Sequence, residues 1–157
     1  MSDAVDSSTS AQNNFTPQAV EYFMAIVDYM RTNMPGFQDD AMEVIYGYLS
    51  IEENRLRGGS PRSRHMIGEA MDVRPTPNTD ERKCILATVA ETVALEKKLG
   101  TEIAIMWGLG GHVHIAILPQ RNIHKRYSIN NGEVWTSKSK RNKLAITKII
   151  EKYNLRW

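Results

Sequence analysis

Residues 112–118 alternate between two kinds of side chain, and this alternation is the strongest constraint on the fold. One face of the strand carries Val113, Ile115 and Ile117, and the other carries His112, His114, Ala116 and Leu118. A strand of this kind is half buried, with a hydrophobic layer under one face only. We expect the two imidazoles side by side on the other face, about 7 Å apart at Cβ.

Several further segments have the pattern of regular secondary structure. Thr16-Pro17 supplies the N-cap and first residue of a helix that ends before Pro35-Gly36. Asp80 is expected to cap a second helix that runs to about Lys98 and is ended by Gly100. Strands are expected at 44–49, 70–73 and 102–107. A polar stretch at 50–54 follows, and the Arg- and Gly-rich segment 56–61 is expected to form a loop.

The chain has 157 residues and is 41% hydrophobic, which is enough for one core. We therefore expect one α+β domain, in which a small antiparallel sheet packs against helices. The predicted organisation is a flexible N-terminal arm at 1–14, a main domain at 15–118 and a basic C-terminal extension at 119–157. The extension packs on the main domain or projects from it, with a hairpin near 130–132 and a helix at about 143–153.

Charge is distributed unevenly along the chain. Residues 119–157 contain ten Lys and Arg residues against two acidic residues, a net charge of +8, which leaves −6 for residues 1–118. Such a basic segment is most often a solvated face. The alternatives are contact with an anionic cell-wall polymer, nucleic acid or an acidic protein. Nucleic acid is the least expected partner, because no recognised nucleic-acid motif accompanies the basic residues.

The N-terminal sequence and the single cysteine bear on localisation. Residues 1–10 lack the basic and apolar regions of a secretory signal, and no stretch approaches the roughly 18 apolar residues of a membrane span. We therefore expect neither a signal peptide nor a membrane span. Cys84 lies in the apolar rhythm of a predicted helix, and its expected burial fits a reducing compartment.

Three residues match the ligand types of catalytic zinc sites. His65 and Asp72 belong to one loop and strand unit, and His114 lies on a distant strand. Gly68 lets the backbone turn between the first two, and Ala70 leaves room for a neighbouring element. A His-x-His pair alone is weak evidence, because two hydrogen-bonded or exposed histidines would have the same spacing. With His65 and Asp72 added, the set favours a site for zinc or another first-row ion.

Two stretches of the chain carry a resemblance to a known family. The residues concerned are Gly47-Tyr48, Ser50, Asn54-Arg55, Gly58-Gly59, Pro61, Ser63, His65, Gly68, Ala70 and Asp72, followed by His112-Val113-His114. This pattern resembles the zinc D-Ala-D-Ala carboxypeptidases and the phage L-alanyl-D-glutamate endopeptidases. The resemblance extends over about residues 16–118 and implies the hedgehog/D-Ala-D-Ala peptidase-like fold.

The resemblance also implies roles for individual residues. His65, Asp72 and His114 would bind Zn²⁺, and His112 would act beside it as the catalytic residue. Zinc lowers the pKa of its bound water from about 15.7 to about 7. Arg55 and Ser63 are expected to contribute to substrate binding, although the Ser63 hydroxyl could equally cap the local backbone.

Two departures from the family pattern concern catalysis. Family members usually have arginine after Gly-Tyr, where this chain has Leu49, and loss of one oxyanion donor costs about a hundredfold to a thousandfold in rate. A nearby arginine could replace the family arginine, unless these side chains are solvated. The candidates are Arg55, Arg57, Arg62 and Arg64. Many relatives have a carboxylate three residues before the third ligand, where this chain has Gly111. Glu69 is expected to point into solvent.

The leading hypothesis is a zinc peptidase that hydrolyses an amide bond in peptidoglycan stem peptides. The alternative is a virion component of a phage tail or baseplate with a catalytically degenerate peptidase fold, in which 1–14 and 119–157 contact other virion proteins. In either case we expect a phage protein made in the host cytoplasm. It would act at the cell wall after release or as part of a virion.

Overall fold

The computed structural model describes residues 15–33, 42–47, 49–56, 58–60 and 62–129, and all structural statements concern these residues. The elements in chain order are α2 (Pro17–Asn33), β1 (Met42–Tyr46), α3 (Ile51–Leu56), the 3-10 helix η1 (Arg64–Ile67), β2 (Ala70–Pro75), α4 (Asp80–Lys97), β3 (Gly100–Met106), β4 (His112–Leu118) and β5 (His124–Ser128). The expected α+β fold is confirmed.

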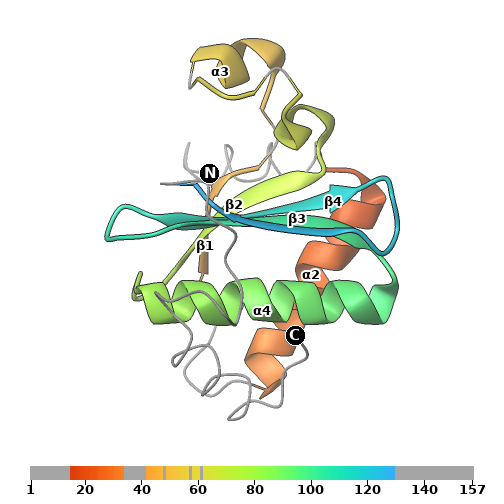
Figure 1. The fold of residues 1–157 in the computed structure, drawn as a ribbon, viewed down its shortest axis with the longest axis vertical. Coiled ribbons are helices and arrows are strands. Elements are labelled where there is room, and N and C mark those ends of the chain that lie inside the picture. Colours follow the sequence, from red (N-terminus) through yellow and green to blue (C-terminus); the bar gives the residue numbers. More distant parts are fainter. Residues whose placement is uncertain (1–14, 34–41, 48, 57, 61, 130–157) are drawn as a thin grey trace, which may run out of the picture.

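The strands form one sheet in the order β1-β2-β4-β3-β5 (Figure 1). The first four strands in this order are antiparallel, as expected, and β5 runs parallel to β3 at the edge. In the register, His114 of β4 lies opposite Asp72 of β2 on one side and Ala104 of β3 on the other. The pairing therefore places the two distant predicted ligands on adjacent strands.

The two faces of the sheet have different neighbours. Helix α4 packs against β2, β3 and β4, and α2 packs on α4, where the Tyr22 hydroxyl donates to Ala90 O at 2.7 Å. Helix α3 lies on the opposite side of the sheet (Figure 1). Val113, Ile115 and Ile117 are buried in the core under α4, as the alternation of β4 predicts. The imidazoles of His112 and His114 therefore lie on the face that α4 does not cover.

The helix boundaries agree with the prediction at α2 and differ at α4. Thr16 Oγ1 accepts from Ala19 N at 3.2 Å and caps α2. The predicted cap of α4 was wrong by one residue, because Thr79 is the N-cap and its hydroxyl accepts from Arg82 N at 3.2 Å. Lys98, in the left-handed region at φ 58°, ends α4, whereas Gly100 begins β3.

Two short elements were missed by the sequence analysis. Helix α3 overlaps the polar stretch 50–54, for which no regular element was expected, and Ser50 and Glu53 at its start bond reciprocally between side chain and backbone at 3.1 Å. Strand β5 was not expected at all, since its sequence His-Lys-Arg-Tyr-Ser has little apolar alternation. The hairpin and helix expected at 130–132 and 143–153, like the arm at 1–14, lie outside the described residues.

Contacts from the helix-covered side hold β5 in place. Thr101 Oγ1 and His124 Nδ1 are 2.9 Å apart, and Trp107 Nε1 donates to Ser128 Oγ at 2.9 Å. Arg126 forms a forked ion pair with Glu91 of α4, with Nε donating to Oε2 at 2.6 Å and Nη2 donating to Oε1. Glu91 is only 2% exposed, so the guanidinium is its essential partner.

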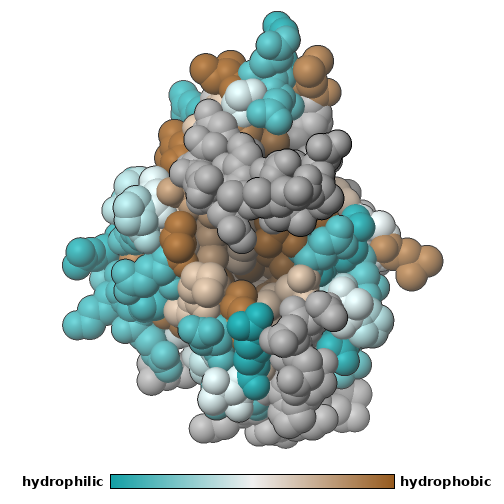
Figure 2. Space-filling model, turned by 180° about the vertical axis from the view of Figure 1, so that it is seen from behind, coloured by the Kyte–Doolittle hydropathy of each residue, from teal (hydrophilic) through white to brown (hydrophobic). Residues whose placement is uncertain are grey.

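The surface of the described residues carries both hydrophobic and hydrophilic side chains. Figure 2 views the molecule from behind, where hydrophobic side chains gather near the centre and hydrophilic ones lie mostly on the flanks. Exposed large apolar residues such as Val20, Val44 and Leu109 belong to separate elements, which is normal for single residues. None of the helices in the described part of the chain has the length and hydrophobicity that crossing a bilayer requires.

We expect Arg126→Ala to lower the free energy of unfolding by about 3–5 kcal/mol, because it leaves a buried carboxylate unpaired. Urea denaturation followed by circular dichroism measures this loss. Lys97→Ala is the control, since it breaks an exposed pair with Glu21 at 3.1 Å and should cost at most about 1 kcal/mol. Equal losses in the two variants would contradict the stabilising role of Arg126.

Candidate metal centre and active site

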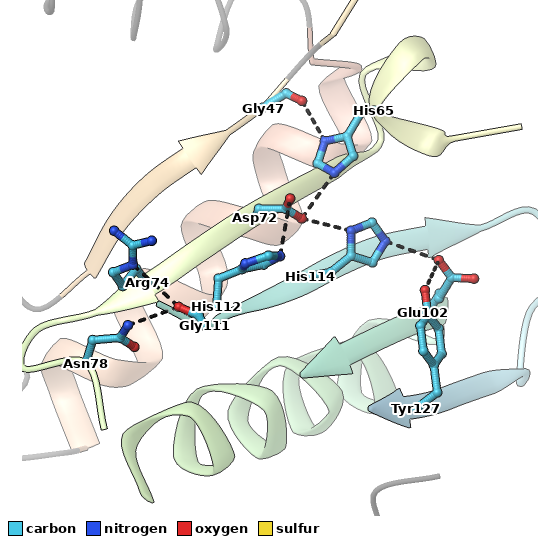
Figure 3. A network of polar contacts seen from close by, with 10 residues as sticks. All are labelled: Gly47, His65, Asp72, Arg74, Asn78, Glu102, Gly111, His112, His114 and Tyr127. Carbon is cyan, nitrogen blue, oxygen red and sulfur yellow. Dashed lines mark hydrogen bonds and ion pairs between the residues drawn. The ribbon is translucent and has the colours of Figure 1, made fainter. Parts of the chain in front are cut away.

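A row of polar side chains crosses the open face of the sheet (Figure 3). Asp72 on β2, His114 on β4, Glu102 on β3 and Tyr127 on β5 each bond to the next member of the row. Alternation puts these four side chains on one face, while the residues between them enter the core. The sheet thereby assembles residues from four strands into one polar site.

His65 reaches this row from η1, which precedes β2. Ser63 caps η1, with its Oγ accepting from His65 N at 3.3 Å, and Gly68 ends it at φ 70°. The predicted turn at Gly68 is thus confirmed. The His65 ring is buried between Gly47 O, 2.7 Å from Nδ1, and Asp72 Oδ1, 3.1 Å from Nε2. Because the Gly47 carbonyl can only accept, Nδ1 carries a proton, which leaves Nε2 as the ring nitrogen that could bind a metal ion.

His114 approaches the same carboxylate from the other side. Its Nδ1 lies 2.9 Å from Asp72 Oδ1, and its Nε2 lies 3.1 Å from Glu102 Oε1. One potential ligand atom from each of His65, Asp72 and His114 lies within 4.8 Å of the others. The three predicted ligands are therefore brought together.

The contacts within the site shift the pKa values of Asp72 and His114 in opposite directions. Burial alone would raise the pKa of Asp72, but hydrogen bonds from His114 and His65 and their charges hold it well below its usual range. Burial alone would lower the pKa of His114, but its bonds to Asp72 and Glu102 outweigh burial and raise it to about 9. The protonated ring thus supplies the positive charge that the two carboxylates require.

The donor set fits a zinc ion. Two imidazole nitrogens and one carboxylate oxygen are the ligands of a three-residue catalytic site that leaves a fourth position for water. The outer nitrogen of each histidine also faces an acceptor, the Gly47 carbonyl for His65 and the Glu102 carboxylate for His114. Such outer partners orient the ring and fix its tautomer in metal sites.

His112 lies beside the ligands on the same face of β4. Its Nε2 is 3.5 Å from Asp72 Oδ2, whereas the contacts of His65 and His114 given above are with Oδ1. The preceding loop is fixed by Asn78, whose Nδ2 donates to Leu109 O at 2.9 Å and to Gly111 O at 3.0 Å. The second histidine is therefore held next to the ligand set without belonging to it.

A pocket of about 540 Å³ opens over these residues. Its floor includes His65, Asp72, His112 and His114, and its rim includes Arg62, Ser63, Arg64 and Tyr127. The volume lies in the range of small-molecule and peptide side-chain sites. The lining also includes Glu102, Leu118 and Ile129, so the pocket presents both charges and some apolar surface to a substrate.

Comparison with known proteins identifies the family. A family model described as peptidase M15 matches residues 4–116. The chain belongs to the peptidase M15 family. M15 peptidases are zinc-dependent metallopeptidases, so the predicted family and the hydrolase class are confirmed. Searches of curated proteins and of solved structures find no match to this M15 chain.

The structure explains one departure of this M15 chain from the expected pattern. A Cβ atom at Gly111 would lie 1.8 Å from Met106 O, so no side chain fits at that position. The carboxylate expected three residues before His114 is therefore excluded by the shape of the loop. The other departure, Leu49, is buried at 5% exposure and does not line the pocket.

The predicted substrate residues have different positions. Ser63 lines the pocket and also caps η1, so both of its expected roles are compatible with the structure. Arg55 does not line the pocket; its side chain is 76% exposed, 3.8 Å from Glu52. Arg62 and Arg64 do line it, and Arg57 lies outside the described residues. The expectation that Glu69 points into solvent was wrong, because it pairs with Arg64 at 2.7 Å.

Sequence reasoning missed Glu102 and the position of Tyr127 in the M15 site. Glu102 was assigned to a strand but given no role, and Tyr127 was given neither an element nor a role. The available signal was the glycine-rich sequence of the five-residue loop 107–111, because a short hairpin connection brings the polar faces of β3 and β4 together. No comparable signal existed for the parallel pairing of β5.

We expect zinc binding to this site to release more than one proton at about pH 7.5, because the ring of His114 keeps its second proton up to a pKa of about 9 and a zinc-bound water would also lose most of one proton at this pH. Zinc affinity should therefore rise with pH, by at least about tenfold per unit from pH 7 towards 9. Calorimetric titration in buffers of different ionisation enthalpy counts the released protons. A pH-independent affinity over this range would contradict the prediction.

Proposed function

We propose that this M15 protein hydrolyses an amide bond in the peptide part of peptidoglycan, with His65, Asp72 and His114 as zinc ligands and His112 as the catalytic residue. The observation that carries the proposal is the group of three ligand atoms within 4.8 Å on a pocket floor that also holds His112. The motif resemblance to cell-wall peptidases supports the choice of peptidoglycan and of a phage source.

The chain's own residues would first bind and orient the ion. His65 Nε2, Asp72 Oδ1 and His114 Nδ1 converge, while Gly47 O and Glu102 Oε1 retain the outer ring protons. A zinc ion bound there would supply Lewis-acid activation of water and of the scissile carbonyl. Loss of any ligand should therefore remove both the metal and the activity.

His112 would then transfer the proton of the attacking water. Its position beside Asp72 Oδ2, at 3.5 Å, places the imidazole at the edge of the ligand set and inside the pocket. Because position 111 has no room for a carboxylate, His112 is our candidate for the general base in this pocket. It would accept a proton from the attacking water at Nε2 and return it to the leaving amine.

The rim of the pocket would bind the substrate. Arg62 is an exposed cation on this rim, and Arg64, which is paired with Glu69, lies beside it. Stem peptides of peptidoglycan carry carboxylates that an arginine can bind through charged hydrogen bonds. Arg62 is thus our candidate for the substrate contact that the sequence analysis assigned to Arg55.

The decisive experiment combines elemental mass spectrometry with amine release from purified peptidoglycan. We expect about one zinc per wild-type chain together with turnover, and neither in His114→Ala. Zinc without release of amines from any peptidoglycan type would favour the alternative of a virion component that keeps a degenerate peptidase fold. Absence of zinc from the wild type would overturn the proposed metal site.

We expect His112→Ala to retain its zinc and to lose about a hundredfold to ten-thousandfold in kcat, because it removes the proton-transfer group and no ligand. Steady-state amine release and metal content should be measured on the same preparation. Lys97→Ala is the control, because this residue of α4 pairs with Glu21 at an exposed position and does not line the pocket. A His112→Ala enzyme as active as the control would exclude the catalytic role of His112.

A further inference from the structure

We propose that Glu102 and Tyr127 are positioning residues for the metal: Glu102 holds the ring proton of His114 on Nε2, which frees Nδ1 for the ion, and Tyr127 orients Glu102. This inference rests on the proposed zinc site. It assigns a function to two side chains that the sequence motifs do not include.

The need for Glu102 follows from the surroundings of the His114 ring. Nδ1 lies 2.9 Å from the carboxylate of Asp72, which can accept a proton from that nitrogen. A neutral imidazole carries one proton, and if Nδ1 kept it, this nitrogen could not bind a metal. Glu102 Oε1, 3.1 Å from Nε2, offers a second anionic acceptor on the far side of the ring. The proton can then stay on Nε2 while Asp72 and Nδ1 both bind the ion.

The register of the sheet places Glu102 for this contact. His114 lies directly opposite Ala104, and Glu102 lies two residues away on the same face of β3. Diagonal neighbours of this kind are within reach of long side chains. Ala104 is small and fully buried, so it leaves the space through which Glu102 meets the ring. A larger residue at position 104 would separate the two groups.

Tyr127 extends the row from β5. It lies opposite Ala104 in the parallel β3 and β5 pair, and its hydroxyl donates to Glu102 Oε1 at 3.4 Å, a long hydrogen bond. Lys125 lies opposite Glu102 in the same pair. Strand β5 falls beyond residue 116, where the family match ends. Part of the support for this metal site therefore comes from a segment outside the matched region.

His65 shows the same arrangement with a weaker partner. Its outer nitrogen donates to a neutral backbone carbonyl, Gly47 O, whereas the outer nitrogen of His114 faces a carboxylate. A charged partner makes a stronger hydrogen bond and increases the basicity of the ligand. We therefore assign to Glu102 a contribution to metal affinity as well as to ring orientation.

The test is zinc affinity by competition with a chromophoric chelator at fixed pH. We expect Glu102→Leu, which has similar volume but no acceptor, to weaken zinc binding about 10- to 100-fold. Glu102→Gln, which keeps a neutral acceptor, should lose less, and Tyr127→Phe about twofold to fivefold. Glu43→Gln, at an exposed carboxylate on β1, is the control and should bind like the wild type.

A spectroscopic measurement separates positioning from packing. In ¹⁵N-labelled, zinc-loaded protein, the Nε2 proton of His114 should be protected from solvent exchange in the wild type and should exchange rapidly in Glu102→Leu. If Glu102→Leu fails to fold, Glu102→Gln provides the test, through its reduced affinity and a shifted Nε2 resonance. Wild-type affinity together with an unchanged Nε2 proton in the variants would overturn the inference.

The outcomes that would reject the proposed peptidase function differ from those that would reject the positioning role of Glu102. Absence of zinc from the wild type would overturn the metal site and this inference together. Stoichiometric zinc with the expected loss in Glu102→Leu, but without amine release, would support the positioning role and reject the peptidase.

Discussion

The pairing of β2 with β4 places Asp72 directly opposite His114, and the site depends on this one cross-strand neighbour. The Asp72 carboxylate contacts both ligand histidines through Oδ1 and approaches His112 through Oδ2. A shift of one residue in the register would turn either side chain into the core. The apolar alternation of β4 prevents such a shift, because Val113, Ile115 and Ile117 would lose their burial under α4.

The two faces of the single sheet therefore differ in function, because one face stabilises the fold and the other carries the polar site. The covered face holds the core and the contacts that fix β5, including the Arg126 and Glu91 pair. The open face carries the row from Asp72 to Tyr127. Since neighbouring residues of each strand serve opposite faces, the core contacts of Ile103 and Ile105 also position Glu102 and Ala104. Rigid strands rather than loops thus supply most of the site.

The grouping of the three candidate ligands was predictable because its signals are local. Ser63 and Gly68 bracket the turn that carries His65, and the alternation in β4 fixes the face of His114. The same local reasoning failed where several nearby side chains could form the same contact and the sequence does not specify which of them does. Glu69 meets Arg64 in this way, and the Thr79 hydroxyl, rather than Asp80, caps α4.

The sequence by itself determined the chemical types of the candidate ligands, the face on which His112 and His114 lie, and the α+β class of the fold, because periodicity and capping act over a few residues. Only the tertiary structure decided that Glu102 and Tyr127 join the site, since strand order and register arise from packing of the whole sheet. It also decided that Gly111 admits no side chain, because the obstructing atom, Met106 O, belongs to the other strand of the hairpin.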